Sequence, residues 1–139
     1  MQRRNVILIS SADGNTMLMC KRRKSPDKGL FSFLGGAIES GEDSAAAAYR
    51  ILEAEAGICT RDIQLRHVMD ITYYQQDCCL EIYAGRLQEE VKVWGTENEL
   101  LWMGLHEDFC NGEVFAGEGN IWYITEYVKK TTDILENKS

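Results

Sequence analysis

Between Gly35 and Ile58 the chain reads GGAIESGEDSAAAAYRILEAEAGI, and its glycines, carboxylates and single arginine are the residues best suited to chemistry. Carboxylates that share one face of a helix form a hard oxygen site for magnesium. A helix must hold these side chains, because the alanines from 45 to 48 are strong helix formers and Gly57 is suited to a left-handed cap. We therefore expect a Gly-Gly turn, an acidic loop and a helix that ends near Ala56.

The start of this helix carries two candidate caps. Ser40 and Ser44 have short hydroxyls of the kind that accept a hydrogen bond from a backbone amide one turn on. Glu42 and Asp43 place negative charge beside the positive end of the helix. An ordinary amphipathic helix with a capped start, whose apolar residues belong to the core, would have the same features.

The spacing of the segment resembles the Nudix box of nucleoside-diphosphate-X hydrolases. From Gly36 the pattern runs through five residues to Glu42 and through seven more to Arg50, and it ends with Glu55, Gly57 and Ile58. The resemblance implies an α+β fold, a Nudix-type α/β/α sandwich with a mixed β-sheet between helices. It also implies a pyrophosphohydrolase that cleaves a diphosphate anhydride, with magnesium or manganese as the cofactor.

Two residues of the helix depart from the family pattern, because Ile51 and Ala54 stand where the family has glutamates. Positions 51, 54, 55 and 58 share one helix face at about 100° per residue, so the family's three carboxylates converge there and only Glu55 remains. Glu53 cannot replace them, since it projects about 200° away from Glu55. Magnesium often uses one or two carboxylates when substrate phosphates complete its shell. Hydrolysis therefore stays open beside a second hypothesis, a nucleotide-binding or regulatory module without catalysis.

The resemblance also assigns roles to residues along the chain. Glu55 would be a metal ligand or general base, with the Gly36 carbonyl as a second metal ligand and Glu97 as a third. Arg50 would pair with Glu42 or Glu55 and hold the loop on the helix. The residues that would contact the substrate are Arg23 at the phosphates, Gly35 and Gly36 in the turn, and Ser32, Glu118 and Asn120 at the base.

Several of these residues also have an ordinary structural interpretation. Arg23 belongs to the basic cluster from Lys21 to Lys24, which would equally keep the end of an edge strand soluble. Glu97 would serve as a solvated loop acid. Glu118 and Asn120 would serve as caps of the last helix.

The rest of the chain supplies the elements that must position these residues. Short apolar runs bounded by polar residues predict strands, and an Asp-Gly turn at Asp13 predicts a hairpin. The order is a hairpin, an extended arm, the helix, three strands and a last helix, which is an α+β arrangement. The predicted strands and arm are Asn5 to Ser10, Met17 to Arg22, Leu30 to Leu34, Ile63 to Thr72 with a bulge, Cys79 to Arg86, and Glu99 to Leu105.

The last helix is predicted from Asn120 to Lys130, before a polar tail from 131 to 139. Its apolar face should consist of Ile121, Ile124, Tyr127 and Val128. The length of 139 residues suits a single domain that spans the whole chain, 1–139.

Composition excludes several classes of function. With a net charge of −7, 45% hydrophobic and 27% charged residues, the chain is typical of soluble globular proteins. One basic cluster is too little for a long nucleic acid, which needs a broad basic face, so a small anionic nucleotide-type ligand is favoured. No apolar run approaches the ~18 residues of a membrane span, and the start has no secretory signal. We expect a cytoplasmic monomer or homodimer.

The cysteines and histidines do not indicate a metal or redox site. The five cysteines are an odd number without a C-x-x-C pair, which favours free thiols over a disulfide framework or a zinc site. Neighbouring Cys78 and Cys79 would be strained if bridged, which disfavours a redox pair. His67 and His106 are each alone in sequence, and a lone histidine near a strand is more often structural than catalytic.

Overall fold

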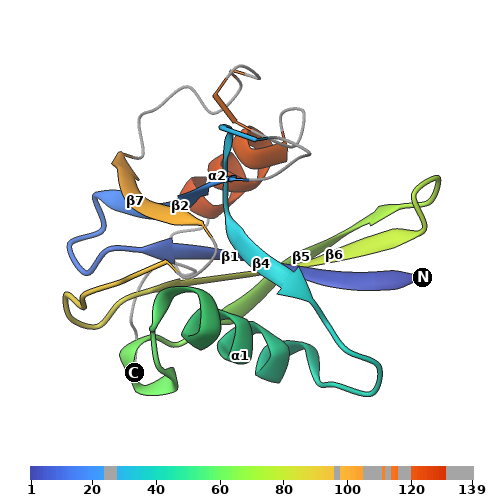
Figure 1. Ribbon diagram of the computed structural model, residues 1–139, viewed down its shortest axis with the longest axis horizontal. Coiled ribbons are helices and arrows are strands. Elements are labelled where there is room, and N and C mark those ends of the chain that lie inside the picture. The colour runs from blue at the N-terminus through green and yellow to red at the C-terminus, as the bar shows by residue number, and fades with distance from the viewer. Residues whose placement is uncertain (24–27, 96–97, 105–110, 112–113, 116–119, 131–139) are drawn as a thin grey trace.

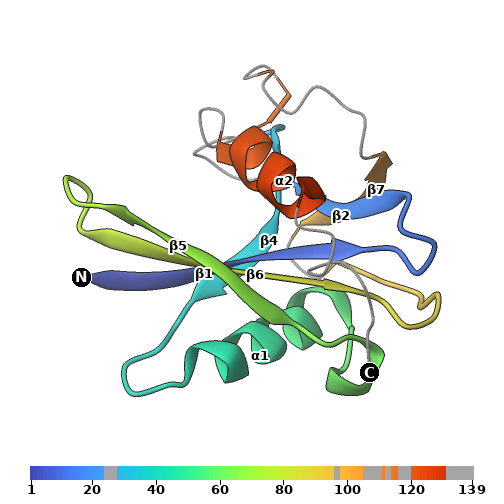
Figure 2. The same ribbon diagram turned by 180° about the vertical axis from the view of Figure 1, so that it is seen from behind.

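The computed structural model describes residues 1–23, 28–95, 98–104, 111, 114–115 and 120–130. A mixed sheet lies between two helices, with α1 (Ser44–Ala56) on one face and α2 (Asn120–Lys130) on the other (Figure 1, Figure 2). This arrangement confirms the predicted α+β sandwich.

Strands of the described residues pair in one sheet, with β1 at its centre. β1 pairs in parallel with β6 and antiparallel with β2 and β4, whereas the other pairs of named strands are antiparallel. All the predicted strands are present, but β5 begins at Arg66 rather than Ile63, and its predicted bulge lies between His67 and Met69. The bounds are β1 Gln2–Ser10, β2 Thr16–Lys21, β3 Phe31–Ser32, β4 Leu34–Ala37, β5 Arg66–Tyr73, β6 Cys78–Arg86 and β7 Glu99–Gly104.

The predicted Gly-Gly turn is instead part of strand β4, where Gly35 lies opposite Val6 and Gly36 opposite Asn5 of β1. A Cβ on Gly35 would overlap the backbone carbonyl oxygen of Asn5. Gly35 is therefore needed where β4 and β1 approach closely, whereas a Cβ on Gly36 would lie 3.2 Å from the Ile51 side chain of α1.

Helix α1 begins and ends at identifiable caps. Its N-cap is Asp43, whose carboxylate accepts a hydrogen bond from the Ala46 amide at 3.0 Å. The prediction of Ser40 or Ser44 as the cap is therefore wrong, because Ser44 is already the first helical residue and its hydroxyl accepts from the Tyr83 hydroxyl at 2.7 Å. The predicted C-cap is confirmed, since Gly57 has a φ of 73°.

Helix α2 has the predicted bounds but a different buried face. Ile124 and Val128 are buried as predicted, and Thr125 is buried with them. Tyr127 is 42% exposed, so its assignment to the apolar face is wrong. A face centred on Ile124, Thr125 and Val128 leaves position 127 at the solvent edge. Neither α2 nor any other helix of the described residues has the length and apolar character needed to cross a membrane.

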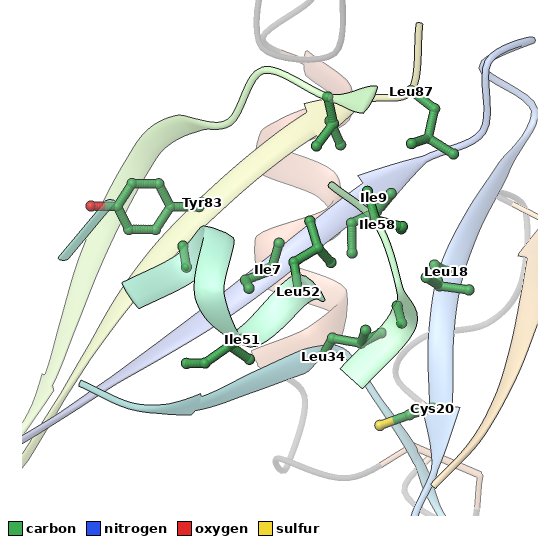
Figure 3. Close-up of a cluster of buried hydrophobic side chains, with 13 residues drawn as sticks. Ile7, Ile9, Leu18, Cys20, Leu34, Ile51, Leu52, Ile58, Tyr83 and Leu87 are labelled. Carbon is green, nitrogen blue, oxygen red and sulfur yellow. The ribbon is translucent and has the colours of Figure 1, made fainter. Parts of the chain in front are cut away.

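The core has two layers because successive side chains of a strand point to opposite faces. Ile7 and Ile9 of β1 pack with Leu52 on the α1 side (Figure 3). Leu8 packs on the α2 side with Ile124 and the methionines of β2. Four of the cysteines, Cys20, Cys59, Cys78 and Cys79, are free thiols, as predicted, and Cys110 lies outside the described residues.

Candidate functional site

A bidentate ion pair holds the acidic loop on helix α1. The Arg50 guanidinium donates to both carboxylate oxygens of Glu42, at 2.8 and 2.9 Å, and also to the Ala37 carbonyl at 3.2 Å. Of the two predicted partners of Arg50, the structure therefore selects Glu42. We call this set, Ala37, Glu42 and Arg50, the brace.

The ion pair of the brace shifts the pKa values of both of its charged residues. Hydrogen bonds from Arg50, and then from the Glu39 amide at 3.1 Å, lower the pKa of Glu42 to about 2. The same ion pair raises the pKa of Arg50. Both groups are therefore charged at neutral pH, and the loop between β4 and α1 is held in one position.

Ile51 lies in the core rather than at a site. Its side chain is only 5% exposed, and a Cβ built on Gly36 would lie 3.2 Å from its Cδ1 atom. Figure 3 shows Ile51 among the buried side chains on the α1 side of the sheet. Ala54 is exposed and Glu55 is half-buried. Positions 51, 54 and 55 therefore differ in exposure although they share one helix face, since the sheet covers the side of α1 that carries Ile51 and leaves Ala54 in solvent.

Glu55 lines a small cavity at the end of strand β2. The cavity has a volume of about 10 Å³, and it is lined by Cys20, Glu55, Asn98 and Leu100. A volume of this order holds roughly one water molecule. Burial raises the pKa of the Cys20 thiol, and the nearby Glu55 carboxylate adds to that shift.

Two predicted substrate residues lie around the same cavity. The Arg23 amide donates to Asn98 Oδ1 at 3.2 Å, and the exposed Arg23 is thereby held beside the cavity. The Ser32 hydroxyl lies 3.3 Å from Cys20 Sγ, because Ser32 of β3 pairs with Cys20 of β2. Arg23 and Ser32 therefore each contact a residue that lines the same cavity as Glu55.

For several other candidate residues, the structure does not describe the side chain. Glu97, Glu118 and His106 lie outside the described residues. Asn120 is the first residue of α2, as predicted, but its side chain also lies outside the described part. His67 Nε2 lies 2.6 Å from Asp70 Oδ1, and its ring contacts that of Tyr83, which fits the structural role expected of it.

Sequence reasoning missed Cys20 and Asn98. Cys20 lines the cavity because β2 pairs with β3 and β7, and no local pattern marks that register. Asn98 stands between Glu97 and Glu99 in the sequence and was not identified as a candidate. A side-chain amide near the basic end of β2 is nevertheless a candidate for holding that strand end through a hydrogen bond.

The residues of the site do not fit a resident magnesium ion. Across the described ranges, no group of three or more His, Cys, Asp and Glu side chains is gathered as a metal site. Glu55 is the only carboxylate in the described lining of its cavity, and Ile51 places an apolar side chain over Gly36. Magnesium requires about six oxygen ligands, so any ion here would depend on a ligand for most of its oxygens.

Comparison with solved structures shows the same fold in several proteins. An Ap4A hydrolase of C. elegans has a TM-score of 0.74 at 15% identity, with 96% of this chain and 98% of that chain covered. A MutT from work on Aliivibrio salmonicida and Vibrio cholerae has a TM-score of 0.69 at 18% identity, with 93% and 98% covered. The NUDIX domain of Shewanella oneidensis NrtR, in complex with ADP ribose, has a TM-score of 0.72 at 11% identity, with 94% and 87% covered.

Sequence comparison gives the family. No curated protein sequence matches the chain. The family description "NUDIX domain" matches residues 1–109, which include β1 to β7, α1 and the brace. The chain therefore belongs to the Nudix domain family, in agreement with the resemblance of its segment from Gly36 to Ile58 to the Nudix box.

Proposed function

We propose that the chain is a slow pyrophosphohydrolase of nucleoside triphosphates or other nucleoside-diphosphate-linked compounds, which receives magnesium together with the substrate. The observation that carries the proposal is the brace, in which Arg50 holds the loop between β4 and α1 on the helix through both carboxylate oxygens of Glu42. A loop that is already in position needs no ordering when the substrate binds. Family membership supports the reaction class.

Each role in this proposal falls on a residue of the predicted site. Glu55 acts as the general base or contacts the incoming magnesium, and the Gly36 carbonyl supplies a second oxygen. Arg23 neutralises phosphate charge, and Ser32 contacts the base. Glu97 is proposed as a further metal ligand, and Glu118 and Asn120 as base-contacting residues. When it is bound to the phosphates, magnesium would withdraw electron density from the anhydride.

Release of nucleoside monophosphate tests this function, because cleavage of a diphosphate anhydride in each compound of the panel below can yield one. A panel of dGTP, diadenosine tetraphosphate and ADP-ribose is incubated at high magnesium, and the products are quantified. We expect Glu55→Gln to lower the rate about 100-fold, within the range of a general base. Glu53→Gln is the matched control, because Glu53 is exposed on the same helix. Equal rates for the two variants would refute the role of Glu55.

A non-catalytic nucleotide-binding module is the second candidate, and the burial of Ile51 over Gly36 favours it. Replacement of two carboxylates by apolar groups removes charge that would otherwise repel a phosphate. Under this alternative, nucleotides bind equally well with and without magnesium, and no product is released. Calorimetry in magnesium and in EDTA, on the same panel, distinguishes the two candidates. Binding that needs magnesium would exclude the metal-free module.

A further inference from the structure

The segment between β6 and β7 closes the C-terminal end of helix α1. The Trp94 amide donates to the Ala56 carbonyl at 3.3 Å, and this carbonyl is one of those that an α-helix leaves without an internal partner. The side chains of Val91 and Val93 pack against the core cluster on the α1 side of the sheet. We call residues 91–95 the strap. The strap therefore holds the last turn of α1 from outside the helix.

The indole of Trp94 lies directly over Gly57, the C-cap of α1. A Cβ built on Gly57 would lie 2.6 Å from Cζ2 and 2.8 Å from Cη2 of that indole, which is too close for a real Cβ atom. Trp94 nevertheless remains 56% exposed. Because more than half of this side chain stays in solvent, the contact buries less apolar area than a core tryptophan would. Its place at the end of the helix is therefore its distinctive feature.

The turn of α1 beneath the indole carries Glu55. Glu55 precedes Gly57 by two residues, and it lines the small cavity at the end of β2 together with Cys20 and Asn98. The last turn of a helix frays readily, because its carbonyls lack internal partners. Fraying of this turn would move the Glu55 carboxylate relative to β2. A contact that holds the turn thus also holds Glu55 at its cavity.

The strap continues to the other side of the same cavity. A Cβ on Gly95 would overlap the backbone carbonyl oxygen of Asn98, so the two backbones are in close contact. Asn98 Oδ1 in turn accepts a hydrogen bond from the Arg23 amide at 3.2 Å. These contacts use backbone atoms and the Asn98 side chain, not the indole. Loss of the indole should therefore affect Glu55 and leave Arg23 in place.

We propose that Trp94 is a positioning residue, whose indole holds the last turn of α1 so that Glu55 stays at its cavity. This inference rests on the proposed function, because Glu55 is the residue to which that function assigns the chemistry. It adds a residue from outside the segment of Gly35 to Ile58 to those on which turnover depends. Misplacement of a catalytic group by about 1 Å costs on the order of 100-fold in rate, so partial fraying should be measurable in kcat.

Steady-state release of nucleoside monophosphate, from the panel compound with the highest rate, tests the inference. We expect Trp94→Ala to lower kcat about 10-fold and to leave KM within twofold, because the hydrogen bond between Asn98 and Arg23 remains. Trp94→Phe, whose shorter ring still covers part of Gly57, should have an intermediate kcat. Tyr74→Ala is the matched control and should leave kcat unchanged, because Tyr74 is an exposed aromatic residue in the turn between β5 and β6.

Hydrogen exchange at two amides of α1 gives a readout that does not depend on turnover. The Gly57 amide donates to the Glu53 carbonyl at 3.0 Å in the last turn, and the Ala47 amide donates to the Asp43 carbonyl at 2.9 Å in the first turn. Trp94→Ala should speed exchange at Gly57 about 10-fold and leave Ala47 within twofold, because only the last turn opens. A general loss of stability would speed exchange at both amides alike.

Each contrary result has its own meaning. If product is released and Trp94→Ala leaves kcat unchanged, the positioning role is wrong and the proposed function stands. If kcat falls but the two amides gain the same factor in exchange rate, Trp94 only stabilises the fold, and the positioning role is again wrong. If the natural chain releases no product from any compound of the panel, the proposed function fails, and the role of Trp94 in it fails too.

Discussion

The segment from Gly35 to Ile58 has a loop half before α1 and a helix half from Ser44 onward, and the two halves differ in how closely they match the Nudix box. The loop half keeps the brace, with both oxygens of Glu42 bonded to Arg50. In the helix half, Ile51 fills the core beside Gly36 and Ala54 is exposed. The comparison shows that hydrogen bonds between protein groups hold the loop on the helix. Hydrogen bonds fix the geometry of the loop half, whereas carboxylates at positions 51 and 54 would add negative charge to the helix half.

The largest expected effect comes from restoring charge to the helix half. Ile51→Glu combined with Ala54→Glu should raise turnover at high magnesium by about 100-fold to 1000-fold, the size of effect that one transition-state charge contact produces. Steady-state release of nucleoside monophosphate measures it. The control is the double variant Ile51→Gln with Ala54→Gln, which has similar size and no charge. A flat rate in the folded glutamate variant would show that missing carboxylates do not limit activity.

The two single substitutions that make up this double variant should differ in their effect on the free energy of unfolding. Ile51→Glu places a charge at a site that is 5% exposed, whereas Ala54→Glu changes an exposed residue. We expect the first change alone to cost several kcal/mol and the second less than about 0.5 kcal/mol. Magnesium should recover part of the loss in the double variant, because a ligand that binds only the folded state stabilises it. Thermal unfolding with and without magnesium measures both effects.

A methyl group at Gly35 should destabilise the pairing of β4 with β1 in the loop half of the segment. Gly35→Ala places a Cβ against the Asn5 carbonyl, a backbone atom that cannot move without separating β1 from β4. We expect a loss of about 3 kcal/mol, the upper end of the usual overpacking cost, in chemical denaturation. Gly104→Ala is the control, since nothing lies within 4 Å of a Cβ there. Equal stability of the two variants would contradict the close approach of the strands.

The brace should show a pH dependence of known sign. The pKa of Glu42 falls from its ordinary value of 4.5 to about 2 in the folded chain. A carboxylate whose pKa is lowered in the folded state stabilises the fold fully at a pH above the pKa it has in the unfolded chain. This contribution to the free energy of unfolding is lost as the pH falls toward the pKa of the folded state. The difference in Tm between the natural chain and Glu42→Gln should therefore be largest near pH 7 and shrink between pH 4.5 and 2. Glu53→Gln, on an exposed helical residue, should show no such trend.

The smallest effect concerns the cap of α1. Asp43→Ala should cost about 1 kcal/mol, because the Ala46 amide loses its acceptor. Asp43→Asn should restore most of it. Ser40→Ala should change stability by less than about 0.5 kcal/mol, in the same denaturation experiment. A larger loss at Ser40 than at Asp43 would show that the cap is assigned to the wrong residue.

Local patterns predicted the elements well. Alternating or continuous apolar runs marked the strands, and Gly57 marked the end of α1, because each depends on neighbours within a few residues. The pair of Arg50 and Glu42 was also predictable, since the spacing of the box specifies both residues. The cap was misassigned because Asp43 and Ser44 have equivalent chemistry, and only the backbone decides which of them lies outside the helix.

Long-range register could not be read from the sequence. The meeting of Cys20, Glu55 and Asn98 depends on how β2 pairs with β7 and on where α1 packs on the sheet. Helical periodicity placed positions 51, 54 and 55 on one arc, but it does not say how much of that arc the sheet covers. The structure shows that the sheet covers Ile51, which the sequence left open between the site and the core.

The central strand has a consequence for how the chain folds during synthesis. β1 pairs with β6 from Gln2 opposite Cys78 to Ser10 opposite Arg86, so its second edge is completed by residues made much later. While the ribosome adds α1, the first strand has partners on one side only, and its other edge stays open to foreign strands. Release of the finished β5–β6 hairpin then closes that edge in a single late step, and a nascent chain stalled before Cys78 would be the form most prone to aggregate.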